Sequence, residues 1–551
     1  MFMCGIWAVF GLKEGVCPDC TKCFSAICHR GPDAWRLEQV ARLPTALLGF
    51  HRLTIIDGLY GMQPMKIHKY PDTNLICNGE IYNCHLLKEQ YTFPYETDCD
   101  VESIIHLYQT EGIEKTVRNL DGVFAFCIVD AVKKKIYIAR DPYGVRPLFT
   151  LVGQDGFLGV CSEAKGLMNL KEKFGHNSTL GQFPPGNYQV WNILPTGKVE
   201  LELTKSYFKP GDLTHSDPFV KDDVLSQMTV SEKTAHLLKE ACRKRMMSDR
   251  RIGCLLSGGL DSSIIAGLIV KLAMEIKLPY PIQTFSIGMA DSPDLHHALT
   301  VARHLGTEHH EVTFDESDVK SCLDKLIYHI ESYDITTVRA SIPMYLLANY
   351  IKENTDTTVI FSGEGADEVA QGYIYFRDAP SADAAHDESV RLLSDIYLYD
   401  GLRADRTTSA YSLELRVPFL DHQFTHHYLN INPKLRQPHE KIEKYLLRHS
   451  FTMTDFLPRV ILWRHKEAFS DGVTCVNKPF YETIAGVIAE QYPKEELEFQ
   501  GLKPLTNEAK YYRYVFEKSF PGEHHLTPYY WMPKWTTATD PSARFITHYN
   551  G

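Results

Sequence analysis

The residues best suited to do chemistry lie in a short stretch near the middle of the chain, Ser257-Gly-Gly-Leu-Asp-Ser-Ser263. An apolar run, residues 252–256, precedes it, and a second apolar stretch follows it. This order predicts a buried parallel strand, a tight glycine turn and a helix. Backbone N–H groups left free at a helix N-terminus, helped by the helix dipole, bind anions such as phosphate. Gly258 and Gly259 can adopt positive φ and let the backbone approach a ligand closely.

Asp261 separates this loop from an ordinary phosphate-binding loop. The stretch lacks the G-x-x-x-x-G-K-[ST] spacing and its lysine. A carboxylate at this point can hold Mg²⁺, which a loop made only of backbone N–H groups cannot do. A plain β–α turn is the alternative for Ser-Gly-Gly alone. Asp261 and the flanking serines favour a nucleotide site.

A second loop with similar chemistry follows another apolar run and reads Ser362-Gly-Glu-Gly-Ala-Asp-Glu368. Its acidic residues predict a second Mg²⁺ ligand, Asp367, which would act together with Asp261. Glu364 would then face the reacting group as a proton acceptor. The alternative is a solvated acidic turn.

The elements that must position these two loops alternate along the second half of the chain. A helix is predicted over residues 229–248. Predicted strands at 283–288, 310–314 and 358–361 are separated by predicted helices at 294–304 and 319–332. Strands joined by helical crossovers form a parallel, doubly wound sheet, and its ligand binds at the carboxyl ends of the strands.

The first half of the chain has a different pattern. Short apolar runs bounded by turns predict strands at 4–11, 47–50, 75–77, 124–129, 135–139 and 157–161. Two helices are predicted among them, at 82–90 and 101–110. Short strands separated by turns favour antiparallel sheets flanked by helices.

The loop at Ser257 resembles the pyrophosphate loop of enzymes that split ATP into AMP and pyrophosphate. Taken with further segments, the chain resembles the family of glutamine-dependent asparagine synthetases from Cys4 to the C-terminal region. The matching segments are 29–33, 50–53, 78–83, 140–148, 333–341, 413–421 and 463–472. Single segments of this kind are weak signals, because N-G-E and R-D-x-x-G are usually turns. Their joint order and spacing carry the resemblance.

For the first half, the resemblance implies the α/β-sandwich of the N-terminal-nucleophile amidotransferases and the hydrolysis of glutamine. Cys4 would be the nucleophile, and its own α-amino group, with a pKa near 8, would be the base. The glutamine-binding residues implied by the match are Arg52 for the carboxylate, Asp100 for the α-ammonium, Asn78 and Gly79 for the oxyanion, and Glu80.

One feature departs from the family pattern: Met1-Phe-Met3 precedes Cys4. An internal Cys4 has an amide nitrogen and therefore no base. Removal of the initiator methionine alone would expose Phe2, whereas translation from Met3 or trimming would expose Cys4. The sequence does not decide which occurs.

For the second half, the resemblance implies adenylation of a carboxylate by Mg²⁺-ATP. The residues implied to bind ATP are Leu255, Ser257, Gly258, Gly259, Asp261, Ser262, Ile287, Ser362 and Gly363. Asp261 and Asp367 would hold the metal. Glu364 and Lys466 would be catalytic, with the mobile ammonium of Lys466 neutralising phosphate charge as AMP forms. Taken alone, Lys466 reads as a helix-surface lysine. Residues 333–341 are expected to face aspartate.

Length and composition bound these expectations. A chain of 551 residues predicts two to four domains. We expect an α/β multi-domain protein with a glutaminase domain at 4–208, a linker at 209–226, a synthetase domain at 227–540 and a C-terminal tail at 541–551.

The net charge of −11 favours neither nucleic acid nor an anionic membrane as a partner. Residues 1–12 are mostly apolar but lack a basic start and an A-x-A-like site, so we do not expect a signal peptide. No segment reaches the length of a membrane span. Fourteen cysteines suit a reducing compartment, and the cytosol is the expected location. Cys17, Cys20 and Cys23 read as unpaired thiols, with a metal site as the alternative.

The predicted function is glutamine-dependent asparagine synthesis with ATP and Mg²⁺ as the cofactors and glutamine and aspartate as substrates. One alternative is a related carboxylate-adenylating amidotransferase with another acceptor. A non-catalytic nucleotide-binding protein is the alternative from another class. The sequence leaves open any ammonia channel and the oligomeric state, for which a homodimer is one option.

Overall fold

Two units with different sheets make up the chain in the computed structural model, which describes residues 4–12, 18–174, 178–212, 225–452, 456–467, 469–474, 479–491 and 498–542. The first unit contains Met1–Lys209 and two short segments from later in the chain, Met247–Arg250 and Ser409–Glu414. The remaining residues form the second unit. The predicted fold class, a mixed α/β protein with antiparallel sheets first and a parallel sheet second, is confirmed.

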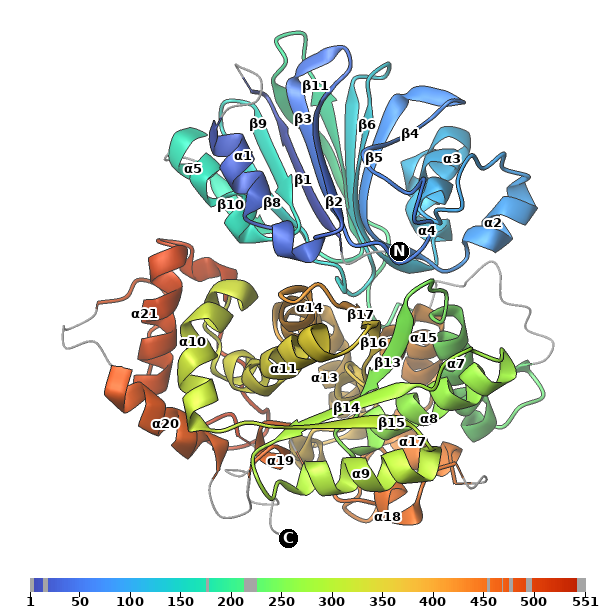
Figure 1. The fold of residues 1–551 in the computed structure, drawn as a ribbon, viewed down its shortest axis with the longest axis vertical. Helices are drawn as coiled ribbons and strands as arrows, with labels where there is room; N and C mark the ends of the chain where they lie inside the picture. Colours follow the sequence, from blue (N-terminus) through green and yellow to red (C-terminus); the bar gives the residue numbers. More distant parts are fainter. Residues whose placement is uncertain are drawn as a thin grey trace. The chain divides into compact units, whose positions relative to one another are not determined.

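The first unit contains two stacked, six-stranded antiparallel sheets (Figure 1). One sheet has the order β10 (Thr179–Gln182), β8 (Phe149–Gly153), β9 (Phe157–Cys161), β1 (Gly5–Phe10), β3 (Leu43–Arg52) and β2 (Ala34–Val40). The other has the order β12 (Val199–Ser206), β11 (Asn187–Ile193), β7 (Lys135–Arg140), β6 (Gly122–Asp130), β5 (Tyr70–Ile81) and β4 (Met65–Ile67). The inner strands are apolar on both faces because the partner sheet covers one side and helices cover the other.

The helices of this unit flank the two sheets (Figure 1). They are α1 (Pro18–Ser25), α2 (Cys84–Tyr91), α3 (Glu102–Glu111), α4 (Ile113–Asn119) and α5 (Met168–Phe174). Every strand predicted in residues 4–161 lies on a strand of the structure, and α2 and α3 are the two predicted helices. The strands without a prediction include the edge strands β2 and β12, which are largely exposed.

The second unit is built on a five-stranded sheet of order β15 (Glu308–Thr313), β14 (Gln283–Gly288), β13 (Arg251–Leu255), β16 (Thr357–Phe361) and β17 (Glu414–Arg416). The four strands from β15 to β16 are parallel. They are joined by α8 (Leu260–Glu275), α9 (Pro293–Leu305), α10 (Glu316–Ile330) and α11 (Ile335–Asn354). Strand order reverses between β13 and β16, which is where ligands bind in doubly wound sheets.

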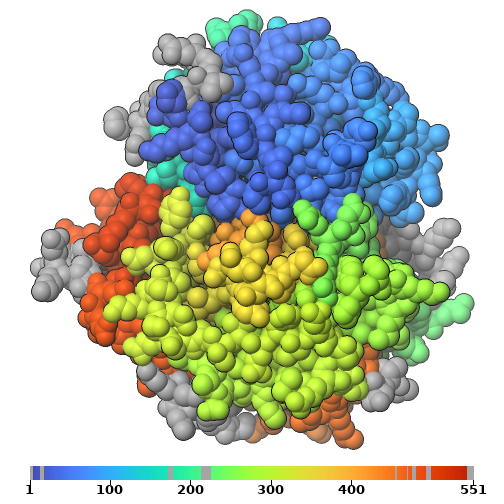
Figure 2. All heavy atoms as spheres, viewed as in Figure 1, coloured from blue at the N-terminus to red at the C-terminus, as the bar shows by residue number. Residues whose placement is uncertain are grey.

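Further helices surround this sheet (Figure 1). They are α7 (Val230–Lys244), α12 (Ala366–Val369), α13 (Ala382–Asp395), α14 (Asp400–Ser409), α15 (His422–Asn430), α16 (Pro433–Arg436), α17 (Tyr445–Ser450), α18 (Arg459–Leu462), α19 (Phe469–Gly472), α20 (Phe480–Gln491) and α21 (Asn507–Ser519). In the space-filling view, the yellow-green segment that contains α9 and α10 forms much of one outer face of this unit (Figure 2). Within the described residues, no helix combines the length and the hydropathy needed to cross a membrane.

Helix α11 was not predicted, and its burial explains why. Thirteen of its twenty residues are buried, so its apolar residues show no helical periodicity, and it contains Pro343. In the aromatic segment near residue 530, Trp531 is buried against Tyr375 and its neighbours.

Candidate active sites

The loop after β13 is shaped by one of its two glycines. Gly258 has φ +72°, and a Cβ on it would lie 2.4 Å from the backbone nitrogen of Ala298. Gly259 has φ −74° and is the N-cap residue of α8. The expectation that both glycines need their conformational freedom is therefore right only for Gly258, which packs against α9.

Helix α8 begins at Leu260, so Asp261 and Ser262 lie in its first turn. The backbone N–H of Ser257 donates to Oγ of Ser262 at 3.2 Å, and the N–H of Gly259 donates to Oγ of Ser257 at 3.3 Å. These bonds close the loop on itself at the positive end of the helix dipole. An anion can bind at this N-terminus of α8.

The loop after β16 lies directly against this helix start. A Cβ on Gly363 would come within 2.8 Å of the backbone nitrogen of Ser262, so a larger residue would separate the two loops. Gly365, at φ +90°, turns the chain into α12, where Asp367 stands in the first turn. The two predicted metal ligands, Asp261 and Asp367, therefore lie close together.

Two lysines form ion pairs with the carboxylates of Asp261 and Asp367. Nζ of Lys444 lies 2.5 Å from Oδ2 of Asp261 and 2.5 Å from Oδ1 of Asp367. Nζ of Lys466 lies 2.6 Å from Oδ2 of Asp367. Burial raises the pKa of Asp367, but the two ammonium groups outweigh burial and hold that pKa well below its usual range. Asp367 is therefore ionised at neutral pH.

The carboxylates of Asp261 and Asp367 fit a hard divalent cation. Oδ1 of Asp261 is buried and accepts no hydrogen bond in the described structure. No group of three or more potential metal ligands occurs among the described residues. Mg²⁺ is typically held by one or two carboxylates together with substrate phosphates and water, so two carboxylates suffice.

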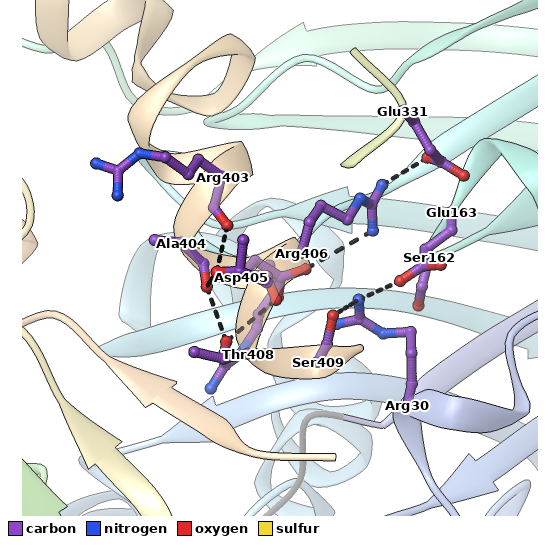
Figure 3. A network of polar contacts seen from close by, with 12 residues as sticks. Arg30, Ser162, Glu163, Glu331, Arg403, Ala404, Asp405, Arg406, Thr408 and Ser409 are labelled. Carbon is purple, nitrogen blue, oxygen red and sulfur yellow. Dashed lines mark hydrogen bonds and ion pairs between the residues drawn. The ribbon is translucent and has the colours of Figure 1, made fainter. Parts of the chain in front are cut away.

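Glu364 lies in the same cavity and is held by Arg403 of α14. Nη2 of Arg403 donates to Oε2 of Glu364 at 2.8 Å and to Oδ1 of Asp400 at 2.7 Å. Burial raises the pKa of Glu364, and Arg403 only partly offsets this rise. A carboxylate with a raised pKa is better suited to accept a proton. Figure 3 shows Arg403 and Arg406 pointing away from α14 in different directions, with Arg406 bound to Glu331.

One cavity collects most of the predicted ATP-site residues. It is lined by Leu255, Ser257, Gly259, Asp261, Ser262, Ile287, Ser362, Gly363, Glu364, Asp367 and Lys466. Gly258 is not among the lining residues, since it faces α9. Of residues 333–341, Thr336 and Ala340 line the cavity, whereas Arg339 turns to Glu508 and Asp540.

Sequence reasoning missed several charged residues of this cavity, namely Asp400, Arg403, Lys444 and Arg448. They lie on helices or at helix starts, outside the two glycine loops that follow β13 and β16. A charged residue on a helix is usually solvated, so no local signal distinguishes these four.

In the first unit, Cys4 immediately precedes β1, which pairs with β3 so that Gly5 lies opposite His51. The register places Cys4 beside the end of β3, where Arg52 is found. Cys4 is fully buried, and Sγ lies 4.0 Å from the carbonyl oxygen of Leu53. Burial raises the thiol pKa well above its usual value. Residues 1–3 lie outside the described residues, so the question of the free amino group stays open.

Arg52, Asn78 and Asp100 also gather in this unit. The Arg52 guanidinium donates to the carbonyl oxygens of Asp57 and Gly58. The side chain of Asn78 is buried on β5, and its amide nitrogen and oxygen make no hydrogen bond within the described structure. An unpartnered amide in a buried position fits the predicted oxyanion donor.

Gly79 and Asp100 are fixed by the end of β5. A Cβ on Gly79 would lie 2.3 Å from the carbonyl oxygen of Val123, so only glycine fits there. Oδ2 of Asp100 accepts the backbone N–H of Ile81 at 2.6 Å. Burial raises the Asp100 pKa to about 6. Glu80 is likewise fully buried on this strand.

Residues from the second half of the chain also belong to the first unit, and no local sequence pattern predicts this. Nη1 of Arg30 donates to Oγ of Ser409 at 3.1 Å, and Oγ of Ser412 donates to the carbonyl oxygen of His29 at 2.6 Å (Figure 3 shows the former). Glu414 is fully buried with its carboxylate 3.9 Å from Arg146.

The cysteine-rich segment has the features of ordinary thiols. Cys20 and Cys23 are buried on α1, and Cys28 is exposed. Burial raises the pKa of Cys23 to about 11, so its thiol is protonated. Cys17 lies outside the described residues.

Comparisons with known proteins find matches to both halves of the chain. A model of the glutamine amidotransferase domain matches residues 3–183, and a model of asparagine synthase matches residues 233–384 and 377–539. The chain is 50% identical over 556 residues to asparagine synthetase (glutamine-hydrolyzing) of Gallus gallus, covering 99% of both chains. It is 49% identical over 559 residues to that of Bos taurus and 48% identical over 559 residues to that of Homo sapiens, again covering 99% of each chain. With these matches along its whole length, the chain belongs to the family of glutamine-hydrolysing asparagine synthetases.

Proposed function

We propose that the chain makes asparagine from aspartate, with ATP as the energy source and glutamine as the nitrogen donor. The single observation that carries the synthetase half is the meeting of Asp261, Asp367 and Lys466 at the carboxyl ends of β13 and β16. Family membership and the cavity beside these residues support the same reaction.

In the synthetase reaction, the aspartate β-carboxylate attacks the α-phosphorus of ATP, and pyrophosphate leaves. Ammonia then displaces AMP, which is a far better leaving group than a carboxylate oxygen. The N-terminus of α8 would bind the phosphate chain, and Lys466 would neutralise the charge that develops there. Glu364 would take the proton released when ammonia attacks. Asp261 and Asp367 would hold Mg²⁺, which when bound supplies positive charge to the phosphates.

In the glutaminase reaction, the Cys4 thiolate attacks the side-chain amide of glutamine. A thioester forms, ammonia leaves, and water then releases glutamate. Because burial disfavours the thiolate, an adjacent base is required, and a free α-amino group on Cys4 would serve. Asn78 and Gly79 would bind the oxyanion, while Arg52 and Asp100 would bind the charged groups of glutamine.

We further propose Met1–Lys209, with its two later segments, as the glutaminase domain and the second unit as the synthetase domain. The cytosol as location and a homodimer as assembly stay predictions.

The test incubates the purified protein with Mg²⁺-ATP and aspartate, with glutamine or ammonium as nitrogen source, and quantifies asparagine and AMP. Product from both sources is the expected result. Product from ammonium alone would keep the synthetase reaction and point to a blocked Cys4.

Two other results would favour the rival functions. ATP bound without AMP production would favour a non-catalytic nucleotide-binding protein. AMP formed only with another carboxylic acid in place of aspartate would favour a related amidotransferase.

A further inference from the structure

Lys444 holds an unusual place in the synthetase cavity. It stands between the two carboxylates to which the proposed reaction assigns the metal, with Nζ 2.5 Å from an oxygen of each. Its side chain is only 2% exposed, so this ammonium has little access to solvent. A buried ammonium held this close to two carboxylates is a strong electrostatic contact.

The backbone around Lys444 is shaped for this position. Lys444 has a left-handed conformation, with φ +56°, at the start of α17. Gly372 makes room for its side chain, because a Cβ on Gly372 would lie 1.9 Å from Cε of Lys444 and 2.0 Å from Oδ1 of Asp367. The left-handed backbone of Lys444 and the space left by Gly372 both fit this contact.

The charges of this cluster balance. Asp261 and Asp367 each carry −1, while Lys444 and Lys466 each carry +1 and contact these carboxylates directly. Among the neighbouring charges of the cavity, Arg403 contacts both Glu364 and Asp400, and Arg464 contacts Asp294. With both lysines in place, the two carboxylates offer a free divalent cation no net negative charge.

We propose that Lys444 is an internal counter-cation of the metal site: it holds Asp261 and Asp367 together without nucleotide and keeps them from binding Mg²⁺ alone. The metal is then bound only in company with the phosphate chain, whose negative charge offsets the positive charge of Lys444 and so attracts Mg²⁺ to the cluster. Lys444 is thus a positioning residue that acts through the two carboxylates. This inference rests on the proposed function for the identity of the metal and the nucleotide.

The test measures binding to the full chain without turnover. Lys444→Met removes the charge and keeps much of the volume, and the cluster then has a net charge of −1. We expect Lys444→Met to bind Mg²⁺ alone at least about tenfold more tightly than the unchanged protein, followed as a rise in melting temperature with Mg²⁺ concentration. Inorganic pyrophosphate in excess chelator should bind about tenfold more weakly to Lys444→Met, because one cation is lost.

Tighter binding of Mg²⁺ together with weaker binding of pyrophosphate would identify Lys444 as a counter-cation. Loss of a purely structural residue would weaken the binding of both. Lys434→Met is the matched control: Lys434 is exposed, and the same charge change there should alter neither affinity. Unchanged Mg²⁺ affinity in Lys444→Met would overturn the proposal.

A compensating variant covers the case in which Lys444→Met does not fold. Asp261→Asn/Lys444→Met restores a neutral cluster and should fold without gaining Mg²⁺ affinity. If neither variant folds, Lys444 serves packing and the proposal is wrong. Failure of the proposed function is seen separately, as the absence of AMP from the unchanged protein with its full set of substrates.

Discussion

At the scale of single residues, we expect Asp100 to link glutamine binding to pH. Its pKa of about 6 lies above the usual value of a carboxyl group, because burial disfavours the charged form. Only the ionised form can pair with the α-ammonium of glutamine. Binding should therefore be at full strength above pH 7 and weaken as pH falls through 6, approaching tenfold weaker per pH unit below it.

This prediction is best measured by calorimetry on Cys4→Ala, which can bind glutamine without hydrolysing it. The charges of glutamine itself do not change between pH 5 and 8, so the dissociation constant reports the protein. Asp100→Asn should bind weakly at every pH. A dissociation constant that stays flat between pH 5 and 7 in Cys4→Ala would remove Asp100 from the ammonium site.

Lys466 gives a second prediction at this scale. Burial lowers its pKa, but Asp367 and Asp261 more than offset this effect, so the ammonium stays charged at all accessible pH values. Lys466→Met should lower AMP formation by about 10²-fold or more, as is typical when one donor to a developing charge is removed. Glutamine hydrolysis should be unchanged. Equal loss of both activities would indicate a folding defect instead, and Lys434→Met supplies the charge-matched comparison.

Cys4 gives a third. Protein in which Cys4 is the first residue should hydrolyse glutamine, whereas protein that keeps Met1–Met3 should release no ammonia from glutamine above background. The reason is that an amide nitrogen is not basic, and burial keeps the thiol protonated. Intact mass measurement identifies the N-terminus in each preparation, and ammonia release measures hydrolysis. Equal rates from both preparations would require a different base.

At the scale of the elements, the turn after β13 depends on one glycine. Gly258→Ala places a methyl group about 2.4 Å from a backbone nitrogen and forces alanine to a positive φ. We expect a loss of stability of about 2 kcal/mol or more, seen as a lower midpoint of unfolding. Gly259→Ala is the matched control for stability, since φ is −74° and the nearest atom, Oγ of Ser257, lies 3.3 Å from the added carbon. Similar midpoints for the two variants would contradict this account of the turn.

The elements also show what the sequence can and cannot predict. Strand β14 lies at the predicted residues 283–288, and β13 and β16 lie within one residue of prediction, because short apolar runs before glycine loops are unambiguous. The loops directly after β13 and β16 can therefore be predicted as well, and with them Asp261 and Asp367. Helix α11 was missed since burial on all sides erases periodicity.

Lys444 and Arg403 were missed for another reason. They enter the cavity from helices that are distant in the sequence, and only the folded chain brings them to the carboxylates. Tertiary proximity of this kind leaves no local pattern.

At the scale of the whole molecule, the first unit is not a continuous piece of chain. Segments 247–250 and 409–414 belong to it. Asp249 donates its backbone N–H to the carbonyl oxygen of Ile55 at 2.9 Å, and Nε of Arg250 donates to that of Thr54 at 2.7 Å. Thr54 and Ile55 lie on the segment that follows Arg52, the residue proposed to bind the glutamine carboxylate.

A fragment of residues 1–212 should therefore fold less stably than the same residues do in the full chain. It lacks Ser409 and Ser412, so the buried guanidinium of Arg30 loses a partner and the carbonyl of His29 loses a donor. Buried polar groups left without partners cost about 1–3 kcal/mol each. We expect faster proteolysis between Leu53 and Gly58 and a raised KM for glutamine in the fragment. A full-length chain carrying Ser409→Ala and Ser412→Ala, which removes the two hydroxyls alone, should show part of the same change. If the fragment matches the full chain in proteolysis rate and in KM, the later segments are dispensable, and the glutaminase domain ends near residue 209.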